Sequence, residues 1–232
     1  MRIPLTKYGL PQVAVFPAIM VVIMIVLLLL GLKLKAAPWV IIVIEVLLII
    51  VLGWVLAFFR DPHRVIPQGK DILLSPADGV VSDIEVIEDC EWIEGKVLRI
   101  GIFLNIFNVH INRVPCAVKI EGIEYKEGQF KNACDPESAR VNEANSVIMT
   151  RLESPTDKLV VRQISGAIAR RIVCAAKAGD EFKQGDQFGM IKFGSRTELY
   201  LPHSDSVKVE VEIGDKVRAG LDVFVKYTDN SN

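Results

Sequence analysis

The chain has 232 residues, of which 51% are hydrophobic and 24% charged, and its formal net charge at neutral pH is -1. A charge balance this close to neutral, with no basic run, argues against a protein that binds nucleic acid through a positive surface. High hydrophobicity combined with an ordinary share of charges predicts a membrane segment joined to a soluble domain.

Two long apolar segments occupy the first quarter of the chain. Residues 13–32 are almost wholly apolar, and residues 38–59 are apolar apart from Glu45. Each can form a helix that crosses a hydrocarbon core of roughly 30 Å, and the second span argues against a cleaved signal peptide. We therefore expect residues 1–59 to be a membrane anchor of two transmembrane helices with both ends on one side. We expect Glu45 to pack at the hairpin interface or near one end of its helix, not to serve transport.

The cations that flank the two spans predict the orientation of the anchor. More of them lie on the side of the soluble domain than at the hairpin connection, so the soluble domain is expected on the cytoplasmic face of the cell membrane. Segment 60–64 is expected at the interface, with its cations near anionic headgroups. The cations on the side of the soluble domain are Arg2, Lys7, Arg60, Arg64 and Lys70, and those at the hairpin connection are Lys33 and Lys35.

Residues 60–232 are enough for one well-packed domain. After a linker at 60–75, short β-rich runs alternate with Gly, Pro, Asn and Asp at hairpin-like spacing. One helix is expected over 166–176, where Ile168 and Ile172 repeat at i, i+4. The predicted class is mainly β (α+β), a β-sandwich or barrel-like domain with few short helices. The predicted strands are 79–86, 96–103, 118–125, 147–152 and 158–164.

A weak internal repeat marks the C-terminal part. In each copy Gly-Asp opens a turn, apolar residues face the core, and a second Gly permits another turn. Such pairs occur in carrier-like barrels, so a non-enzymatic membrane-anchored adaptor is one alternative, although the exposed Met-Lys-Met of those carriers is absent. The repeat places residues 194–195 between its copies, near a strand connection. The copies are Gly179, Asp180, Phe182, Gly185, Phe188 and Gly214, Asp215, Val217, Gly220, Val223.

Cysteine and histidine usage predicts neither disulfides nor a metal site. The four cysteines are widely scattered without a C-x-x-C pair, and the three histidines lie far apart in sequence. This pattern suits a reducing cytoplasm, and no metal is expected.

Three short segments carry the candidate chemistry: Gly194-Ser195, His110 and Asp78. A serine hydroxyl can attack the carbonyl of the residue before it when a flexible glycine permits the strained backbone. An ordinary imidazole titrates near neutrality, so His110 is the best candidate base, and Asp78 could fix its tautomer. A serine hydrolase would use the same three residue types, but the G-x-S-x-G elbow is missing.

Five segments, in order and at sensible spacing, resemble the signatures of the phosphatidylserine decarboxylase family in its short, membrane-anchored form. The resemblance covers nearly all of the soluble part. The segments are Phe58-Phe59-Arg60-Asp61-Pro62, Ser75-Pro76-Ala77-Asp78-Gly79, Val109-His110-Ile111-Asn112-Arg113, Val161-Arg162-Gln163-Ile164 and Phe193-Gly194-Ser195-Arg196.

The resemblance implies a proenzyme that cuts itself between Gly194 and Ser195 into a large chain, 1–194, and a small chain, 195–232. Ser195 would become a pyruvoyl cofactor, with no metal, and would decarboxylate phosphatidylserine to phosphatidylethanolamine through a Schiff base. Archaetidylserine remains an alternative substrate. The implied partners are a phospholipid of the bilayer, the two chains of one precursor and a homodimer of processed protomers, with no nucleic acid.

One position departs from the family pattern. Some longer members carry two histidines three residues apart, and here His110 takes the first position while Arg113 stands at the second. Either His110 serves both self-cleavage and decarboxylation, or another group assists one of them. Arg113 cannot act as a base, but it can hold a carboxylate or phosphate. Arg113 and Arg196 are therefore candidates for substrate binding, with simple pairing to a protein carboxylate as the alternative for each.

Overall fold

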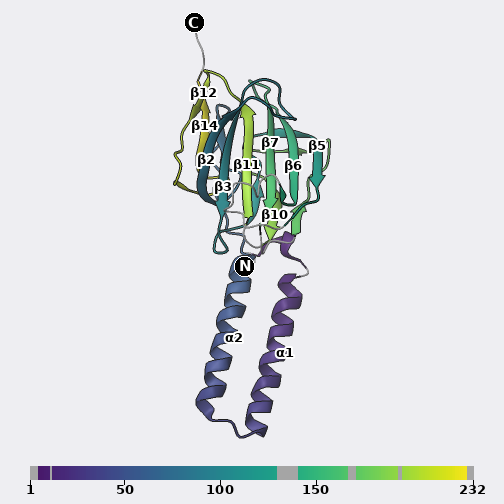
Figure 1. The fold of residues 1–232 in the computed structure, drawn as a ribbon, viewed down its shortest axis with the longest axis vertical. Helices are drawn as coiled ribbons and strands as arrows, with labels where there is room; N and C mark the ends of the chain where they lie inside the picture. Colours follow the sequence, from purple (N-terminus) through teal and green to yellow (C-terminus); the bar gives the residue numbers. More distant parts are fainter. Residues whose placement is uncertain (1–4, 11, 130–140, 167–170, 193–194, 229–232) are drawn as a thin grey trace. The chain divides into compact units, whose positions relative to one another are not determined.

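The computed structural model describes residues 5–10, 12–129, 141–166, 171–192 and 195–228 (Figure 1). Its internal contacts divide the chain into two compact units, Met1–His63 and Arg64–Asn232.

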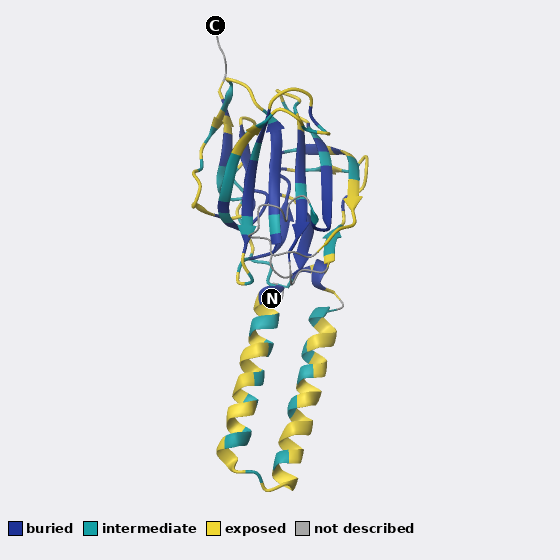
Figure 2. Cartoon of the chain, in the orientation of Figure 1, coloured by how far each residue is buried: buried dark blue, intermediate teal, exposed yellow. Residues whose placement is uncertain are grey.

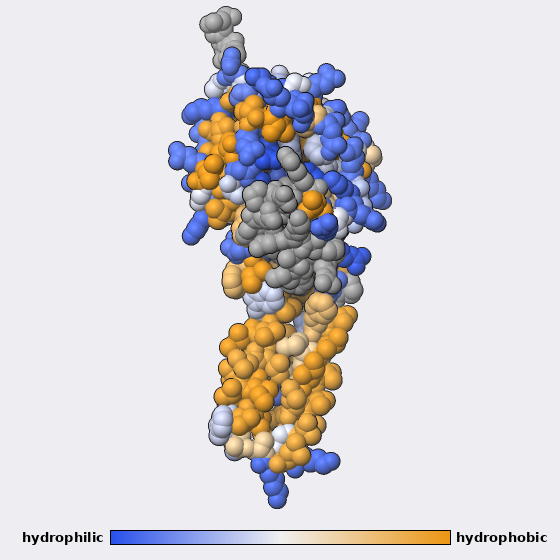
Figure 3. Space-filling view, viewed as in Figure 1, coloured by the Kyte–Doolittle hydropathy of each residue, from blue (hydrophilic) through white to orange (hydrophobic). Residues whose placement is uncertain are grey.

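The N-terminal unit is a helical hairpin. After a short 3-10 helix, η1 (Lys7–Gly9), it contains α1 (Gln12–Lys33) and α2 (Pro38–Phe58). Both helices are long and apolar enough to cross a membrane, and their side chains are largely exposed (Figure 2) and almost uniformly apolar (Figure 3). These properties are compatible with membrane anchoring, as the composition predicted.

Backbone pairing closes the open end of the hairpin. The amide of Thr6 donates to the carbonyl of Phe59 at 2.9 Å, and Leu5 forms a bridge with Arg60. The chain therefore enters α1 and leaves α2 at the same end. Glu45 on α2 lines a small space of about 160 Å³ together with Leu27 and Leu30 of α1, so it lies at the helix–helix interface as expected.

The second unit is built around an antiparallel eight-stranded sheet. Its order is β13-β2-β3-β11-β7-β6-β5-β9, so β11 and β7 lie at the centre (Figure 1). The bounds of its strands are β2 (Gly79–Ile87), β3 (Val97–Leu104), β5 (Val118–Lys126), β6 (Ala144–Arg151), β7 (Lys158–Ser165), β9 (Glu181–Phe182), β11 (Ser195–Pro202) and β13 (Lys216–Val217).

Two three-stranded sheets complete a β-sandwich, as predicted. One has the order β1-β14-β12 and the other β4-β10-β8. Phe224 of the first and Phe188 of the second belong to the same buried cluster as Ile100, Val161 and Leu199 of the large sheet, so one core joins the layers. Their strands are β1 (Ile72–Leu74), β4 (Ile111–Arg113), β8 (Arg171–Cys174), β10 (Gln187–Lys192), β12 (Val207–Val209) and β14 (Val223–Tyr227).

All five predicted strands are confirmed within a few residues, as β2, β3, β5, β6 and β7. The helix predicted over 166–176 is wrong where the structure describes it. Arg171–Cys174 form β8, which pairs antiparallel with β10. Two apolar residues at i, i+4 cannot distinguish a short helix from a short buried strand, and β-branched Ile172 and Val173 favour the strand. Residues 167–170 lie outside the described residues.

The internal repeat corresponds to a real structural duplication. Gly179 and Gly214 have φ angles of 93° and 99°, and Gly185 and Gly220 have 80° and 70°. Each copy thus turns at two positions where the left-handed backbone favours glycine. The short strands that follow the first glycines, β9 and β13, form the two opposite edges of the large sheet.

Candidate functional site

Ser195 is the first residue of a central strand. In β11 it is paired with Leu104 of β3 on one side and with Ser165 of β7 on the other. Because side chains alternate along a strand, Ser195 and Thr197 share the face of Leu199, which is in the core. Ser195 is fully buried, and its Oγ has no hydrogen-bond partner among the residues that the structure describes. Gly194 lies outside the described residues.

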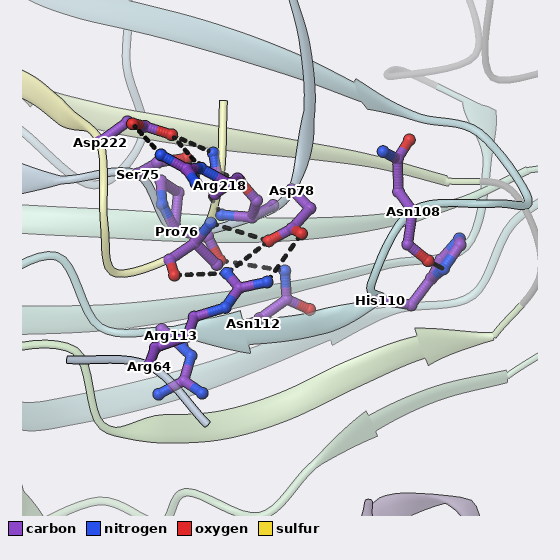
Figure 4. Close-up of polar contacts among 12 residues, drawn as sticks. Arg64, Ser75, Pro76, Asp78, Asn108, His110, Asn112, Arg113, Arg218 and Asp222 are labelled. Carbon is purple, nitrogen blue, oxygen red and sulfur yellow. Dashed lines mark hydrogen bonds and ion pairs between the residues drawn. The ribbon is translucent and has the colours of Figure 1, made fainter. Parts of the chain in front are cut away.

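His110 immediately precedes β4 and is fully buried. Its Nδ1 lies 2.9 Å from the carbonyl oxygen of Asn108 (Figure 4). A carbonyl can only accept, so this contact places the proton of the neutral imidazole on Nδ1 and gives Nε2 the lone pair of a base. The carbonyl of His110 accepts from the amide of Ile191 at 3.2 Å. His110 is thereby tied to β10, the strand that leads into the Gly194-Ser195 bond.

Asn112 joins the three sequence motifs. Its Nδ2 donates to Thr197 Oγ1 at 3.1 Å and lies 3.5 Å from the carbonyl of Pro76. The amide of Arg113 also donates to Pro76, at 3.0 Å. His110 lies two residues before Asn112, just ahead of β4, and Ser195 lies two residues before Thr197 on β11. The period of two therefore puts Ser195 on the same face of β11 as Thr197, the side chain that Asn112 contacts.

A chain of buried amides fixes this register. Asn145 donates to Gln163 Oε1 at 3.0 Å, and Gln163 donates to Asn112 Oδ1 at 2.9 Å. Asn112 then donates to Thr197, so four side chains are hydrogen-bonded in sequence in the interior. Such a satisfied polar chain specifies one alignment of the packed layers, because every shift would leave buried groups unpaired.

Asp78 forms an ion pair with Arg64, a cation expected from the sequence at the membrane interface. Its carboxylate accepts hydrogen bonds from both terminal nitrogens of Arg64, at 2.7 and 2.8 Å, and from the amide of Ala219 at 2.8 Å (Figure 4). The side chain of Arg64 is only 6% exposed. The prediction that Arg64 lies near lipid headgroups is therefore wrong. In this structure the carbonyl of Asn108, rather than Asp78, fixes the tautomer of His110.

The structure holds Arg113 against a backbone carbonyl. Its guanidinium donates to Gly185 at 2.8 Å. By strand alternation, the Arg113 side chain is on the opposite face of β4 from Asn112. This placement gives Arg113 a role in fixing the Gly185 turn beside the site.

Arg196 points to the face of the large sheet opposite Ser195. Its guanidinium contacts Asp83 at 2.6 Å and Glu198 at 2.8 Å. Burial alone would lower the pKa of Arg196, but these carboxylates outweigh it and the net shift is upward. A Cβ on Gly101 would lie 2.4 Å from both Arg196 Nη2 and Asp83 Oδ2, so the glycine makes room for the pair. Pairing with protein carboxylates, the alternative left open by the sequence, accounts for Arg196.

The comparisons with known proteins agree with the motifs. The family model of phosphatidylserine decarboxylase matches residues 51–225. The chain belongs to the phosphatidylserine decarboxylase family. It is 38% identical to the phosphatidylserine decarboxylase proenzyme of Rhodopirellula baltica over 96% of this chain and 91% of that protein. The proenzymes of Desulfotalea psychrophila and Carboxydothermus hydrogenoformans are 44% and 42% identical, over 72% and 74% of this chain and 77% and 78% of theirs.

Membership of the phosphatidylserine decarboxylase family makes the chain an enzyme of the carboxy-lyase class. Within the described parts of the chain, no group of three or more His, Cys, Asp or Glu side chains comes together to hold a metal ion.

Several residues of the site were not predicted from the sequence. Arg64 carried no local signal, because its partner Asp78 is fourteen positions away and on another element. Asn112 and Gln163 were quoted only as parts of motifs, and their shared hydrogen bond depends on the stacking of two sheets. Lys192, two residues before Gly194, is buried. Its pKa is lowered mainly by this burial and further by repulsion from Arg171.

Proposed function

We propose that the chain is a proenzyme that cuts itself between Gly194 and Ser195 and then converts phosphatidylserine to phosphatidylethanolamine and CO2. The observation that carries this proposal is the placement of Ser195. Its hydroxyl is buried, lacks a hydrogen-bond partner in the described part of the chain, and lies on the same strand face as Thr197, the last member of the buried polar chain. A buried hydroxyl without a partner costs stability, so a native protein that keeps one has a reason to do so.

The scission uses groups of the chain itself. His110 Nε2 accepts the hydroxyl proton of Ser195, whose Oγ attacks the carbonyl carbon of Gly194. The amide bond becomes an ester, and the α-proton of residue 195 is then removed. Elimination of the ester releases residue 194 as a carboxylate and leaves dehydroalanine at 195. Tautomerisation and hydrolysis convert dehydroalanine to a pyruvoyl group and ammonia.

The residues around Ser195 fit such a group. A pyruvoyl group supplies an electrophilic ketone that takes up the substrate amine and accepts the electron pair left when CO2 departs. Ser195 and His110 are both fully buried, so the site is shielded from bulk water. With Nδ1 held by Asn108, His110 can carry a proton on Nε2 and deliver it to the α-carbon of the product.

The membrane anchor fits a lipid substrate. Two apolar helices directly precede the catalytic unit, which supports tethering of the enzyme to the bilayer that contains its substrate. We propose that the catalytic unit faces the cytoplasm, because the positive-inside count holds without Arg64. We also propose that the large and small chains stay together and that processed protomers pair. The cations that remain in the count are Arg2, Lys7, Arg60 and Lys70 against Lys33 and Lys35.

The test combines processing with lipid turnover. Purified wild-type chain is expected to run as two bands on a denaturing gel and to release CO2 from serine lipids. Ser195→Ala is expected to stay uncut and inactive, whereas Ser204→Ala, at an exposed turn, is expected to behave as wild type. Assays with ester-linked and ether-linked lipids separate phosphatidylserine from archaetidylserine as the substrate. Normal cutting of Ser195→Ala would disprove the site.

A further inference from the structure

A second buried serine faces the cleavage site. Ser165 is the last residue of β7 and is the register partner of Ser195 on β11. Residues directly opposite each other in antiparallel strands have Cβ atoms about 4.5–5.5 Å apart, so two short side chains at such positions can reach each other. Both serines are fully buried.

The two hydroxyls share an unusual state. Among the described residues, neither Ser165 Oγ nor Ser195 Oγ has a hydrogen-bond partner. The next pair on the same face, Gln163 and Thr197, is fully engaged with Asn112. The two hydroxyls therefore lie one register pair beyond the end of the hydrogen-bonded chain, and buried hydroxyls are rarely left unpaired without a functional reason.

The main chain of Ser165 is fixed on both sides. Its amide donates to the carbonyl of Glu143 at 2.9 Å, and its carbonyl accepts from Asn142 Nδ2 at 2.8 Å. Only the side chain can therefore adjust, by rotation about χ1 among its staggered positions. A rotation of one or both side chains lets the two hydroxyls form a hydrogen bond without moving the backbone.

We propose that Ser165 is a positioning residue for the scission. Its O–H donates to Ser195 Oγ and holds Ser195 in the rotamer from which Oγ attacks the carbonyl carbon of Gly194. The proton of Ser195 still passes to His110 Nε2, and Ser165 keeps its own proton, so no further reactant is needed. This inference rests on the proposed self-cleavage.

The test uses a pair of substitutions that differ only in the hydroxyl. Ser165→Thr keeps the oxygen and Ser165→Val replaces it with a methyl group of similar size. The full chain is made by cell-free synthesis, and the conversion of precursor to two chains is followed on gels over time. We expect Ser165→Thr to cut within about twofold of the wild-type rate and Ser165→Val about tenfold slower, the factor typical of one lost hydrogen bond.

Two controls separate positioning from packing. Ser146→Ala, a buried serine on β6, is expected to cut at the wild-type rate. Ser165→Ala removes the oxygen without adding volume, so it tests the role of the hydroxyl even if the variants with larger side chains do not fold. Equal rates for Ser165→Thr and Ser165→Val, or a wild-type rate for Ser165→Ala, would overturn the inference. Failure of the wild-type chain to cut would instead overturn the proposed function.

Discussion

Asp78→Asn separates a structural role of this carboxylate from a catalytic one. The substitution keeps the size of the side chain but removes the charge that faces Arg64, whose side chain is only 6% exposed. The new amide also turns a donor toward a guanidinium that has only donors. Breaking a buried ion pair from one side costs about 3–5 kcal/mol. For a unit of the size of Arg64–Asn232, each kcal/mol corresponds to about 2–4 °C, so the melting temperature should fall on the order of 10 °C.

The assay is thermal unfolding of the full chain in detergent, followed by the circular dichroism of its β-sheets. Glu210→Gln is the matched control, because Glu210 pairs with Lys208 at the surface, and it should shift the midpoint by no more than about 2 °C. Arg64→Leu combined with Asp78→Leu should recover part of the loss, since no uncompensated charge then remains buried. A wild-type melting temperature for Asp78→Asn would refute this reasoning and leave Asp78 a purely chemical role.

Two further predictions concern the interior of the sandwich. Gln163→Leu leaves Asn112 Oδ1 and Asn145 Nδ2 without their partner, so urea unfolding should show a loss of about 2 kcal/mol or more together with slower self-cleavage; an unchanged midpoint would contradict the role of the amide chain. Burial raises the pKa of the Cys116 thiol from 9.0 to about 12, so this thiol should resist alkylation at pH 8 until the chain unfolds. Because the unfolded thiol loses its proton first, its contribution to stability should decline as the pH rises from about 9 towards 12, and rapid labelling of the folded chain would count against this burial.

Local patterns in the sequence predicted the helices, strands and turns whose formation depends on residues close together in the chain. The two apolar segments, the five alternating strands and the glycines at matching turns all follow from spacing along the chain, and they are confirmed. The error at Arg171–Cys174 arose where the pattern was too short to distinguish helix from strand and where pairing with β10 decided the outcome.

The arrangement of the site depends on contacts that no local pattern contains. The family resemblance predicted Asp78, His110 and Ser195 as site residues. In the structure, the hydrogen-bond partners of Asp78 and His110 differ from those we expected. Arg64, not His110, pairs with the Asp78 carboxylate, and Asn108 orients His110 through a backbone carbonyl. Both contacts result from chain folding around β4 and the loop before β2, which the sequence cannot specify by spacing alone.

Intact mass spectrometry of the purified, catalytically competent protein tests the central claim most directly. Self-cleavage predicts two polypeptides that together account for the chain, with a break before residue 195 and a keto acyl group, in place of a free amine, at the start of the smaller one. A single intact species of 25.8 kDa in a preparation that decarboxylates serine lipids would contradict it.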